Sequence, residues 1–527
     1  METMASMDDE GRESGRVAAV FIALIFLLTL AAVYAPRAWQ ASEAAATAPV
    51  AQPVAPVVEV WLSTADRRLK LAPQPDLALV AADTSPADIT IERDTRYQSM
   101  TGFGAAVTDS SAWLLRNKLS AAKRHALLRE LYGPPPNLNF NMARLTIGAS
   151  DFSLNLYTLD EVPFGQTDPE LDHFSIAPNL PYLVPTMREI MAIHPDMLTV
   201  ASAWSAPPWM KDNDNLIGGT LQQQYEGVYA NYLIRYVDAY EKQGIPIFAL
   251  TLQNEPRYSP LSYPGMQLSA EQRARIVGQH LGPALATRTP KVAILEWDHN
   301  WSHPEEPLQV LGDAKAAPFV DGVAWHCYEG SQHEQGRVHR EHPDKDTYIT
   351  ECSGGDWALN MNGELLWFAR NLLVTGTRQW ARGVIYWNLA LDEDHGPHFG
   401  GCAECRGVVT IDSQTGAITR NGEYYALGHF SRFVLPGAFR VKSNDTDAPK
   451  NLANVAFQND DGSMVLVMVN IATKERRVSV VDGTNRFEYT MPPESVATFV
   501  WNRNLAEEWV RRAAYWIGEA LKPAYRD

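Results

Sequence analysis

The sequence predicts a (β/α)8 barrel of parallel strands, accompanied by an antiparallel β-sandwich that draws strands from both ends of the chain. After residue 97, short apolar runs alternate with helical stretches, which is the order expected of parallel strands joined by crossover helices. Eight such runs occur, the number that closes this type of barrel. After about residue 433 the helical stretches stop, and short β-prone runs are separated by Gly, Asp and Asn turns.

The barrel strands are expected where β-prone apolar residues are followed by polar ones. Their predicted ranges are 102–107, 142–147, 198–203, 245–252, 292–296, 320–326, 347–350 and 383–388. The helix predicted over 222–243 is typical of the connections, because its apolar and tyrosine side chains recur at helical spacing. We expect those side chains to face the core.

The sandwich is expected to combine N-terminal and C-terminal strands. The predicted ranges are 57–62, 89–93, 453–458, 463–470, 477–481, 486–489 and 495–501. The chain therefore divides into five predicted segments, namely an anchor and Ala/Pro-rich linker (1–56), N-terminal sandwich strands (57–97), the barrel (98–432), the main part of the sandwich (433–501) and a C-terminal amphipathic helix (502–527). We expect this last helix to dock on the body of the protein rather than on a partner or a membrane.

Composition and charge limit the classes of partner. The chain has 527 residues, of which 46% are hydrophobic and 20% are charged, as in ordinary globular proteins. Its formal net charge is -17, and no cluster of Lys and Arg is present to neutralise phosphate groups. These observations argue against nucleic acid or acidic lipid as the main partner and favour a neutral substrate.

The N-terminus contains an apolar segment that suits a membrane anchor. Residues 17–35 are nineteen residues without a charge, close to the roughly 20 that cross a bilayer as a helix. Residues 33–35 resemble a signal cleavage site, but Pro36 follows them directly, and a signal peptide core is usually shorter. We favour an uncleaved anchor, with secretion after cleavage as the alternative. Arg12 and Arg16 precede the segment, which predicts that the large domain is exported.

Four cysteines in so long a chain do not form a disulfide scaffold. Cys402 and Cys405 form a single CxxC in a Gly-rich loop, which is compatible with a local disulfide, half of a metal site or a redox pair. No second CxxC or spaced pair of histidines completes a zinc set, so we favour the disulfide. Cys327 and Cys352 are expected as reduced, small apolar packing groups.

Candidate catalytic residues are those at the C-terminal ends of the barrel strands, where such barrels carry their active sites. The residues at these positions are Asp109, Arg144, Trp204, Asn254 with Glu255, Glu296, His326 with Tyr328, Glu351, and Trp387 with Asn388. Glu255 ends the fourth strand, and Glu351 ends the seventh, on the opposite side of the barrel mouth. Alone, Glu255 is more typical of a helix N-cap or a solvated loop acid than of a catalytic group. A facing pair of carboxylates is the minimal equipment for glycoside hydrolysis.

Several long motifs, in one order, resemble glycoside hydrolase family 30 and its glucocerebrosidase-like members. They are GFGAAVTDSSAWLL, ARLTIGASDFS, SAWSAPPWMKDN, LTLQNEP, AWHCY, ITEC and IYWNLAL followed by YYALGHFSRFV, and the resemblance extends over residues 103–501. It implies a retaining double displacement with Glu255 as the acid/base and Glu351 as the nucleophile, about 5 to 5.5 Å apart. The charge of Glu351 and apolar walls are expected to raise the pKa of Glu255, while Arg144 keeps Glu351 ionised.

The resemblance also implies roles in substrate binding. Asn254 corresponds to the residue that bonds the sugar 2-hydroxyl. Asp109, Trp204 and Trp387 correspond to residues that line the first sugar site, and Tyr328 and His326 to residues beside the nucleophile. Glu296 has no such support and is interpreted as structural. No metal or organic cofactor is expected, because the two carboxylates perform the whole proton and nucleophile cycle.

The motifs define the reaction mechanism more closely than they define the substrate. Cys327 stands where the glucocerebrosidase-like pattern has an aromatic residue, and the loop over 395–410 bears little likeness to its counterpart. The leading hypothesis is hydrolysis of glucosylceramide or a related β-glucoside. The first alternative is hydrolysis of a β-1,6-glucan or another β-glycan, and the second is a catalytically silent carbohydrate-binding protein.

Overall fold

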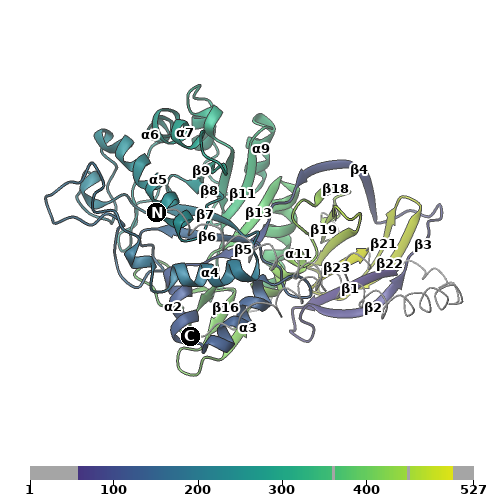
Figure 1. Ribbon diagram of the computed structural model, residues 1–527. Helices are drawn as coiled ribbons and strands as arrows, with labels where there is room; N and C mark the ends of the chain where they lie inside the picture. The colour runs from purple at the N-terminus through teal and green to yellow at the C-terminus, as the bar shows by residue number, and fades with distance from the viewer. Residues whose placement is uncertain (1–56, 359–361, 448–450, 503–527) are drawn as a thin grey trace, which may run out of the picture. The chain divides into compact units, whose positions relative to one another are not determined.

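A computed structural model describes residues 57–358, 362–447 and 451–502 (Figure 1). The predicted anchor and linker, and the predicted C-terminal helix from residue 503 onward, lie outside these residues. Among the helices of the described ranges, none combines the length and the apolar character needed to cross a bilayer.

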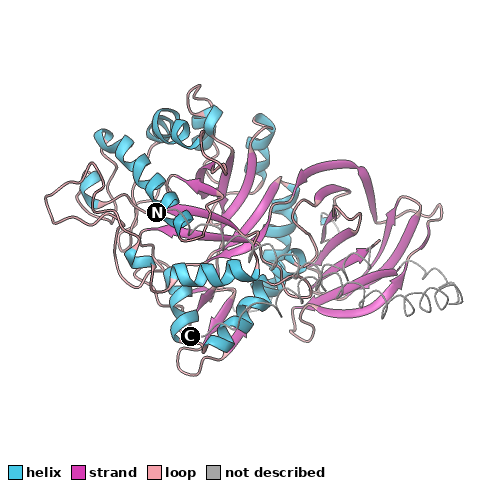
Figure 2. Ribbon diagram, in the orientation of Figure 1, coloured by secondary structure: helices cyan, strands magenta, loops and turns pink. Residues whose placement is uncertain are grey.

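Eight parallel strands close into a barrel, which confirms the predicted fold class (Figures 1 and 2). In chain order they are β5 (Gly102–Ala106), β6 (Met142–Ile147), β7 (Leu198–Ala203), β8 (Ala249–Thr251), β9 (Ala293–Asn300), β10 (Gly322–His326), β11 (Asp346–Glu351) and β13 (Ala381–Tyr386). The fourth strand is shorter than the predicted range of 245–252. Pro246 has no N–H to donate to a ladder, so the strand begins only after it.

The fifth strand extends four residues beyond its predicted end at Glu296. Ala324 pairs with Trp297 and Trp325 pairs with His299, so Asp298 is the extra residue of a β-bulge. Trp297 and Asp298 both have positive φ, at 78° and 53°. Bulges of this kind re-aim side chains next to active sites. The polar residues after Glu296 are thus part of the strand, and one of them is turned toward the barrel mouth.

Helices surround the barrel. The principal ones are α2 (Asp109–Asn117), α3 (Ala121–Tyr132), α4 (Leu183–Ile193), α5 (Glu226–Lys242), α6 (Ala270–Ile276), α7 (Gly282–Leu285), α8 (Glu305–Leu311), α9 (His333–Glu341), α10 (Gly376–Arg378) and α11 (Gly422–Ser431). In α5, Tyr229, Tyr232, Tyr236 and Tyr240 are buried, as their helical spacing predicts. Two small sheets lie in the loops, formed by β12 (Gly354–Gly355) with β15 (Cys405–Arg406), and by β14 (Ala390–Leu391), β16 (Val409–Ile411) and β17 (Ile418–Arg420).

The second domain is a ten-stranded sheet that contains strands from both ends of the described chain, as predicted. Figure 1 shows the purple N-terminal strands beside the yellow C-terminal ones. The strands are β1 (Val57–Thr64), β2 (Ala72–Ala78), β3 (Val80–Ala81), β4 (Ile89–Ser99), β18 (Phe439–Ser443), β19 (Leu452–Gln458), β20 (Met464–Asn470), β21 (Arg476–Asp482), β22 (Asn485–Met491) and β23 (Ser495–Trp501). β1 pairs with β23, and β4 pairs with both β18 and β21.

A buried histidine joins the barrel to the sandwich. His429 of α11 lies 2.9 Å from Thr498 Oγ1 of β23 through Nδ1 and 2.9 Å from Ser63 Oγ of β1 through Nε2. Burial, helped by the positive charge of Arg432, lowers the pKa of His429 to about 3. The ring is therefore neutral in the folded protein at ordinary pH and bonds both domains.

This histidine should make folding stability depend on pH. Below a pH of about 6.5 the unfolded chain protonates His429 and the folded chain does not, so acid favours unfolding until the pH approaches 3. Between pH 6 and pH 4 the wild-type protein should lose about 1.4 kcal/mol of unfolding free energy per pH unit more than the His429→Gln variant. Chemical denaturation at several pH values measures both slopes, and equal slopes would contradict the assignment.

Candidate active site

The two candidate catalytic carboxylates face one small space at the C-terminal mouth of the barrel. Glu255 follows β8 with a φ of 50°, and Glu351 is the last residue of β11. His326 Nδ1 lies 3.1 Å from Glu255 Oε1 and 3.8 Å from Glu351 Oε1. The sum of these distances is the largest separation that the two Oε1 atoms can have, and it excludes the wide end of the roughly 6.5–9.5 Å range typical of inverting enzymes.

His326, the last residue of β10, bridges two carboxylates. Its Nδ1 contacts Glu255, and its Nε2 lies 3.1 Å from Asp298 Oδ1. Because both neighbours accept hydrogen bonds, the ring carries a proton on each nitrogen. Burial alone would lower the pKa of His326, but the charges of Glu351, Asp298 and Glu255 raise it to about 9.

The expectation of a raised pKa at Glu255 was wrong. Burial raises the pKa of this carboxyl, but the neighbouring His299 and His326 outweigh burial and hold it well below its usual range. His299 Nδ1 lies 3.5 Å from Glu255 Oε1. The charge of Glu351 alone would raise this pKa, but the two histidines, which are contributed by β9 and β10, reverse the direction of the shift.

Asp298, which the sequence analysis missed, is the fully buried centre of the site. Five donors surround its carboxylate at 2.6 to 3.1 Å, namely Arg144, Ser202, Thr251, His326 and Thr350. Burial would raise its pKa, but Arg144 and the other donors hold that pKa well below its usual range. The signal for this residue was present in EWDHN, which continues the fifth strand with polar residues.

Arg144, in the middle of β6, connects the predicted residues. Its Nη1 donates to Glu351 Oε2 at 2.5 Å, and its Nη2 donates to Asn254 Oδ1 and to Asp298 Oδ2, both at 2.7 Å. The guanidinium lies 4.8 Å from the ring centroid of Trp204 and 5.4 Å from that of Trp387. The two indole rings stack 5.1 Å apart. The structure thus brings four predicted residues, and the unpredicted Asp298, together around one buried cation.

Two acids lie beyond this network. Asp109 begins α2, and its carboxylate accepts hydrogen bonds from Ser153 Oγ at 2.7 Å and from Tyr157 Oη at 2.8 Å. Asp151, which the sequence analysis did not select, lies in the loop after β6, and its Oδ1 is buried without a hydrogen-bond partner among the described residues. Burial, and then the charges of Glu351 and Glu255, raise the pKa of Asp151 well above its usual value.

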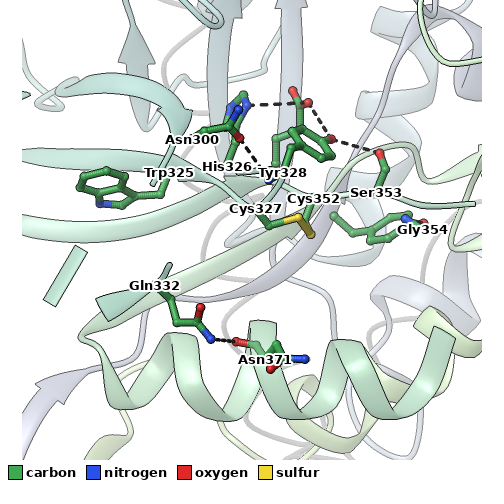
Figure 3. The surroundings of a disulfide bond; sticks show 12 residues. Asn300, Trp325, His326, Cys327, Tyr328, Gln332, Cys352, Ser353, Gly354 and Asn371 are labelled. Carbon is green, nitrogen blue, oxygen red and sulfur yellow. Dashed lines mark hydrogen bonds and ion pairs between the residues drawn. A yellow bond between two sulfur atoms is a disulfide. The ribbon is translucent and has the colours of Figure 1, made fainter. Parts of the chain in front are cut away.

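Tyr328 lies beside Glu351, as the resemblance implied. Its hydroxyl donates to Glu351 Oε1 at 2.8 Å and lies 3.2 Å from Ser353 Oγ. Its backbone N–H donates to Asn300 Oδ1 at 3.1 Å, and Figure 3 shows Asn300, His326, Tyr328 and Ser353 gathered around this point. The tyrosine is 45% exposed, so it reaches the carboxylate from the open side of the site.

A disulfide bond joins Cys327 to Cys352 (Figure 3), and the expectation of two reduced packing residues was wrong. His326 of β10 pairs with Glu351 of β11, so the residues that follow them lie side by side, with Cα atoms 5.3 Å apart. This separation is within the usual range for a disulfide. The bond ties the ends of the strands that carry His326 and Glu351. Cys402 and Cys405 form a second, local disulfide, as favoured from their spacing.

A cavity of about 580 Å³ opens beside the carboxylates. It is lined by Arg257, Tyr258, His299, Asn300, His303, Tyr328 and Glu329. Its lining is polar and aromatic. Glu296, by contrast, is buried in an ion pair with Arg273 at 2.8 Å, in keeping with its structural interpretation.

Comparison with family models decides the classification of the chain. The model of the glycosyl hydrolase family 30 TIM-barrel domain matches residues 100–434, and that of the family 30 beta sandwich domain matches residues 437–499. The chain belongs to glycoside hydrolase family 30. It is therefore a glycosidase by family, and the resemblance found in its motifs is confirmed.

Individual family 30 relatives include enzymes of both expected substrate classes. An endo-1,6-beta-D-glucanase of Neurospora crassa is 33% identical over 482 residues, which covers 86% of this chain and 95% of that protein. The lysosomal acid glucosylceramidase of Mus musculus is 28% identical over 439 residues, covering 79% and 83%. Among solved structures, the endo-beta1,6-glucanase BT3312 superposes with a TM-score of 0.77 at 31% identity, covering 84% of this chain and 99% of that one.

Proposed function

We propose that this family 30 enzyme is a retaining β-glucanase that cleaves β-1,6-linked glucan, with Glu255 as the acid/base and Glu351 as the nucleophile. The observation that supports the mechanism is the approach of His326 Nδ1 to both carboxylates, which holds them on one small space. The substrate is supported by the endo-1,6-glucanase relative, which matches at higher identity and greater coverage than the mouse glucosylceramidase. Glucosylceramide is the second candidate.

The cavity beside Glu255 also favours a sugar over a lipid as the leaving group. Its lining includes Arg257, His303 and Glu329, whose side chains hydrogen-bond to hydroxyl groups readily and to acyl chains not at all. Desolvating these polar and charged side chains against hydrocarbon would cost free energy, whereas a hydroxylated leaving group would avoid that cost by hydrogen-bonding to them. Glucosylceramide would present its ceramide to this surface.

In the first step, Glu351 attacks the anomeric carbon while Glu255 protonates the departing oxygen. Arg144 donates to Oε2 of Glu351, and Tyr328 donates to Oε1, so the carboxylate is oriented before substrate arrives. The carbon–oxygen bond to the leaving group breaks as the glycosyl-enzyme ester forms. The negative charge of Glu351 disappears at the same time.

The proton for this step is held between His326 and Glu255. Before substrate binds, the proton resides on His326, because the imidazolium bonds two carboxylates. A leaving-group oxygen that accepts a hydrogen bond from Glu255 favours the protonated carboxyl, so the proton transfers along the hydrogen bond from Nδ1 to Oε1, whose heavy atoms are 3.1 Å apart, and then to the substrate. In the second step, Glu255 takes a proton from the attacking water.

The sugar is proposed to bind against the indole rings and the adjacent polar groups. Trp204 and Trp387, whose indole rings stack on each other beside Arg144, are the residues proposed to contact the C–H surface of a hexose. Asn254, beside Glu255, is placed to bond the 2-hydroxyl, a contact that should strengthen in the transition state. Asp109 and Asp151 supply acceptors for the outer hydroxyls, and the unpartnered Oδ1 of Asp151 supports this role.

Export to an oxidising compartment is part of the proposal. Residues 17–35 carry no charge and have the length of a membrane-spanning helix. The two disulfides are typical of exported proteins. We propose an anchored, exported enzyme, with cleavage and secretion as the alternative. Protease treatment of intact cells should remove the activity, and activity fully protected inside the cells would contradict export.

The substrate is tested with purified enzyme on a panel containing a β-1,6-linked glucan, a β-1,3-linked glucan, a β-1,4-linked xylan and glucosylceramide in detergent micelles. The β-1,6-glucan should give the highest kcat/KM and release oligosaccharides of retained β-configuration. Preferential hydrolysis of glucosylceramide would select the second candidate. Normal glucan binding without hydrolysis of any panel member would support the non-catalytic alternative.

Glu255→Gln should separate the two steps. Without an acid, turnover of glucan should fall by about 10²- to 10⁴-fold, while an aryl glucoside with an acidic leaving group should still form the glycosyl-enzyme. Added azide, which needs no base, should then restore turnover and give a β-glycosyl azide. The matched control is Glu329→Gln, the same change at a carboxylate of the adjoining cavity. Absence of azide rescue in a folded variant would remove Glu255 from the acid/base role.

The Cys327–Cys352 disulfide should position Tyr328 and Glu351. Replacing both cysteines by serine frees the ends of β10 and β11, and a displacement of about 1 Å at reacting atoms costs up to about 10²-fold in rate. We expect kcat to fall by about ten- to one-hundred-fold, with a smaller change in KM. The double serine variant of Cys402 and Cys405 is the control, and it should keep more of the activity. Equal losses in both variants would contradict a positioning role.

A further inference from the structure

Three metal-binding side chains converge at the mouth of the barrel. Glu255 follows β8, His299 belongs to β9 and His326 belongs to β10, and one ligand atom from each lies within 4.8 Å of the others. Glu255 Oε1 is 3.5 Å from His299 Nδ1 and 3.1 Å from His326 Nδ1. Ligands bound tetrahedrally at about 2.0–2.2 Å stand roughly 3.3 Å apart, so the two spacings from Glu255 Oε1 match a single Zn²⁺-sized ion, and the two histidines, whose ligand atoms lie within 4.8 Å of each other, would draw together on binding it.

His299 contributes an independent observation. Its side chain is 10% exposed, and its Nδ1 is buried without a hydrogen-bond partner among the described residues. A buried ring nitrogen without a partner costs free energy unless a ligand satisfies it. At 3.5 Å from Glu255 Oε1, this nitrogen is directed at the space that the three side chains share.

Asp298 holds His326 through the ring nitrogen that is not a proposed metal ligand. Its Oδ1 lies 3.1 Å from His326 Nε2, and it is fixed by Arg144, Ser202, Thr251 and Thr350. A carboxylate that holds one ring nitrogen of a histidine orients the other nitrogen toward a metal and strengthens it as a ligand. His326 therefore presents Nδ1 to the cluster in a fixed direction.

We propose that Glu255, His299 and His326 form a binding site for Zn²⁺ or a similar divalent transition-metal ion, and that the bound ion inhibits the enzyme. Two imidazoles and one carboxylate, with a fourth position open to water, are ligands that Zn²⁺ accepts, whereas Mg²⁺ and Ca²⁺ prefer oxygen ligands. On binding, the ion takes the place of the proton on His326 Nδ1, and that proton leaves to the solvent.

The inhibition rests on the proposed function, because the ion would occupy the lone pair that Glu255 needs for proton transfer. It would also stand where the leaving-group oxygen is expected. Inhibition should therefore be competitive, with an apparent KM that rises with Zn²⁺ and a kcat that stays constant. A chelator should reverse it.

The test uses the full-length enzyme. Co²⁺, which gives visible absorption when protein nitrogen ligands bind it, is titrated into wild type, His299→Gln, Glu255→Gln and His303→Gln, and Zn²⁺ is used to displace it. The wild type and His303→Gln, which changes a histidine of the same cavity outside the cluster, should bind one Co²⁺ at this site. His299→Gln should weaken binding, and raise the half-inhibitory Zn²⁺ concentration relative to its own uninhibited rate, by more than about ten-fold.

The possible results distinguish failure of the proposed metal site from failure of the proposed hydrolase activity. Binding that His299→Gln and Glu255→Gln leave unchanged, in folded variants, would overturn the metal site. So would Zn²⁺ inhibition that is not competitive. The absorption measurement needs no hydrolysis. If the wild type were inactive but bound Co²⁺ in a manner that depends on His299, the proposed hydrolase activity would be refuted and the proposed metal site would be supported. Retention of Co²⁺ binding in the inactive Glu351→Gln variant, which keeps all three ligands, would support it.

Discussion

Glu351→Gln is expected to lower kcat on β-1,6-glucan by more than about 10⁴-fold, the scale on which removal of a covalent nucleophile acts. An amide cannot form the glycosyl ester, and it carries no charge to pair with the Nη1 of Arg144. The variant should still fold, because Gln fills the same volume and its oxygen accepts from Tyr328. Rates are measured on the glucan and on an aryl glucoside, since loss on both distinguishes a nucleophile from an acid.

A 2-fluoro glucoside with a good leaving group locates the nucleophile directly. The fluorine slows both the formation and the hydrolysis of the glycosyl-enzyme. The good leaving group restores the rate of formation only, so the glycosyl-enzyme accumulates. Mass spectrometry of peptides should find the adduct on Glu351 in the wild type and no adduct in Glu351→Gln. The Glu329→Gln variant, which changes a carboxylate of the adjoining cavity, should carry the same adduct on Glu351 as the wild type. An adduct on any other residue would refute the assigned role.

Much of the fold was predictable because a closed barrel repeats one local pattern. All eight barrel strands were predicted from apolar runs that end in polar residues. In the sandwich, the alternating burial of Val58, Val60 and Leu62 in β1 likewise follows from the period of two in a β-strand. The pair of Glu255 and Glu351 could be found because the C-terminal ends of parallel strands meet at one mouth. These inferences need only periodicity and the direction of the strands.

What could not be predicted depends on register. Asp298 is the extra residue of a bulge between β9 and β10, and Thr350 is the extra residue where β10 pairs with β11. Both bulges turn side chains into the site that ordinary alternation would place elsewhere. The Cys327–Cys352 disulfide has the same origin, because only the pairing of His326 with Glu351 brings the two cysteines together.

The pKa of Glu255 was mispredicted for a related reason. From the sequence, Glu255 is expected to have one carboxylate partner and apolar walls, and both raise the pKa of a carboxyl group. The structure adds two histidines, and one of them is itself charged because it lies between Glu255 and Asp298. The sign of the shift thus depends on side chains from three neighbouring strands, which no single motif contains.

Removal of Arg144 should be the most destabilising single change at the site. The guanidinium is fully buried, and it pairs with Asp298 at 2.7 Å and with Glu351 at 2.5 Å. Breaking a buried ion pair from one side leaves an uncompensated charge, so Arg144→Met should lower the free energy of unfolding by about 3–5 kcal/mol. Chemical denaturation measures this loss. Arg337→Met, at an exposed arginine paired with Glu334 and Glu341, is the control and should change stability by less than about 1 kcal/mol.

A double variant separates stability from catalysis in this network. Adding Asp298→Asn to Arg144→Met removes the uncompensated negative charge of Asp298, so the double variant should recover part of the lost stability. The expected coupling energy between the two sites is about 1–3 kcal/mol. Activity should not recover with it, because Glu351 still lacks its cation and His326 has lost the carboxylate that holds Nε2. Arg144→Lys keeps a charge but cannot reach Asn254, Asp298 and Glu351 together, and should fall between the wild type and Arg144→Met. Additive losses in the double variant would mean that Asp298 is not paired with Arg144 in the folded enzyme.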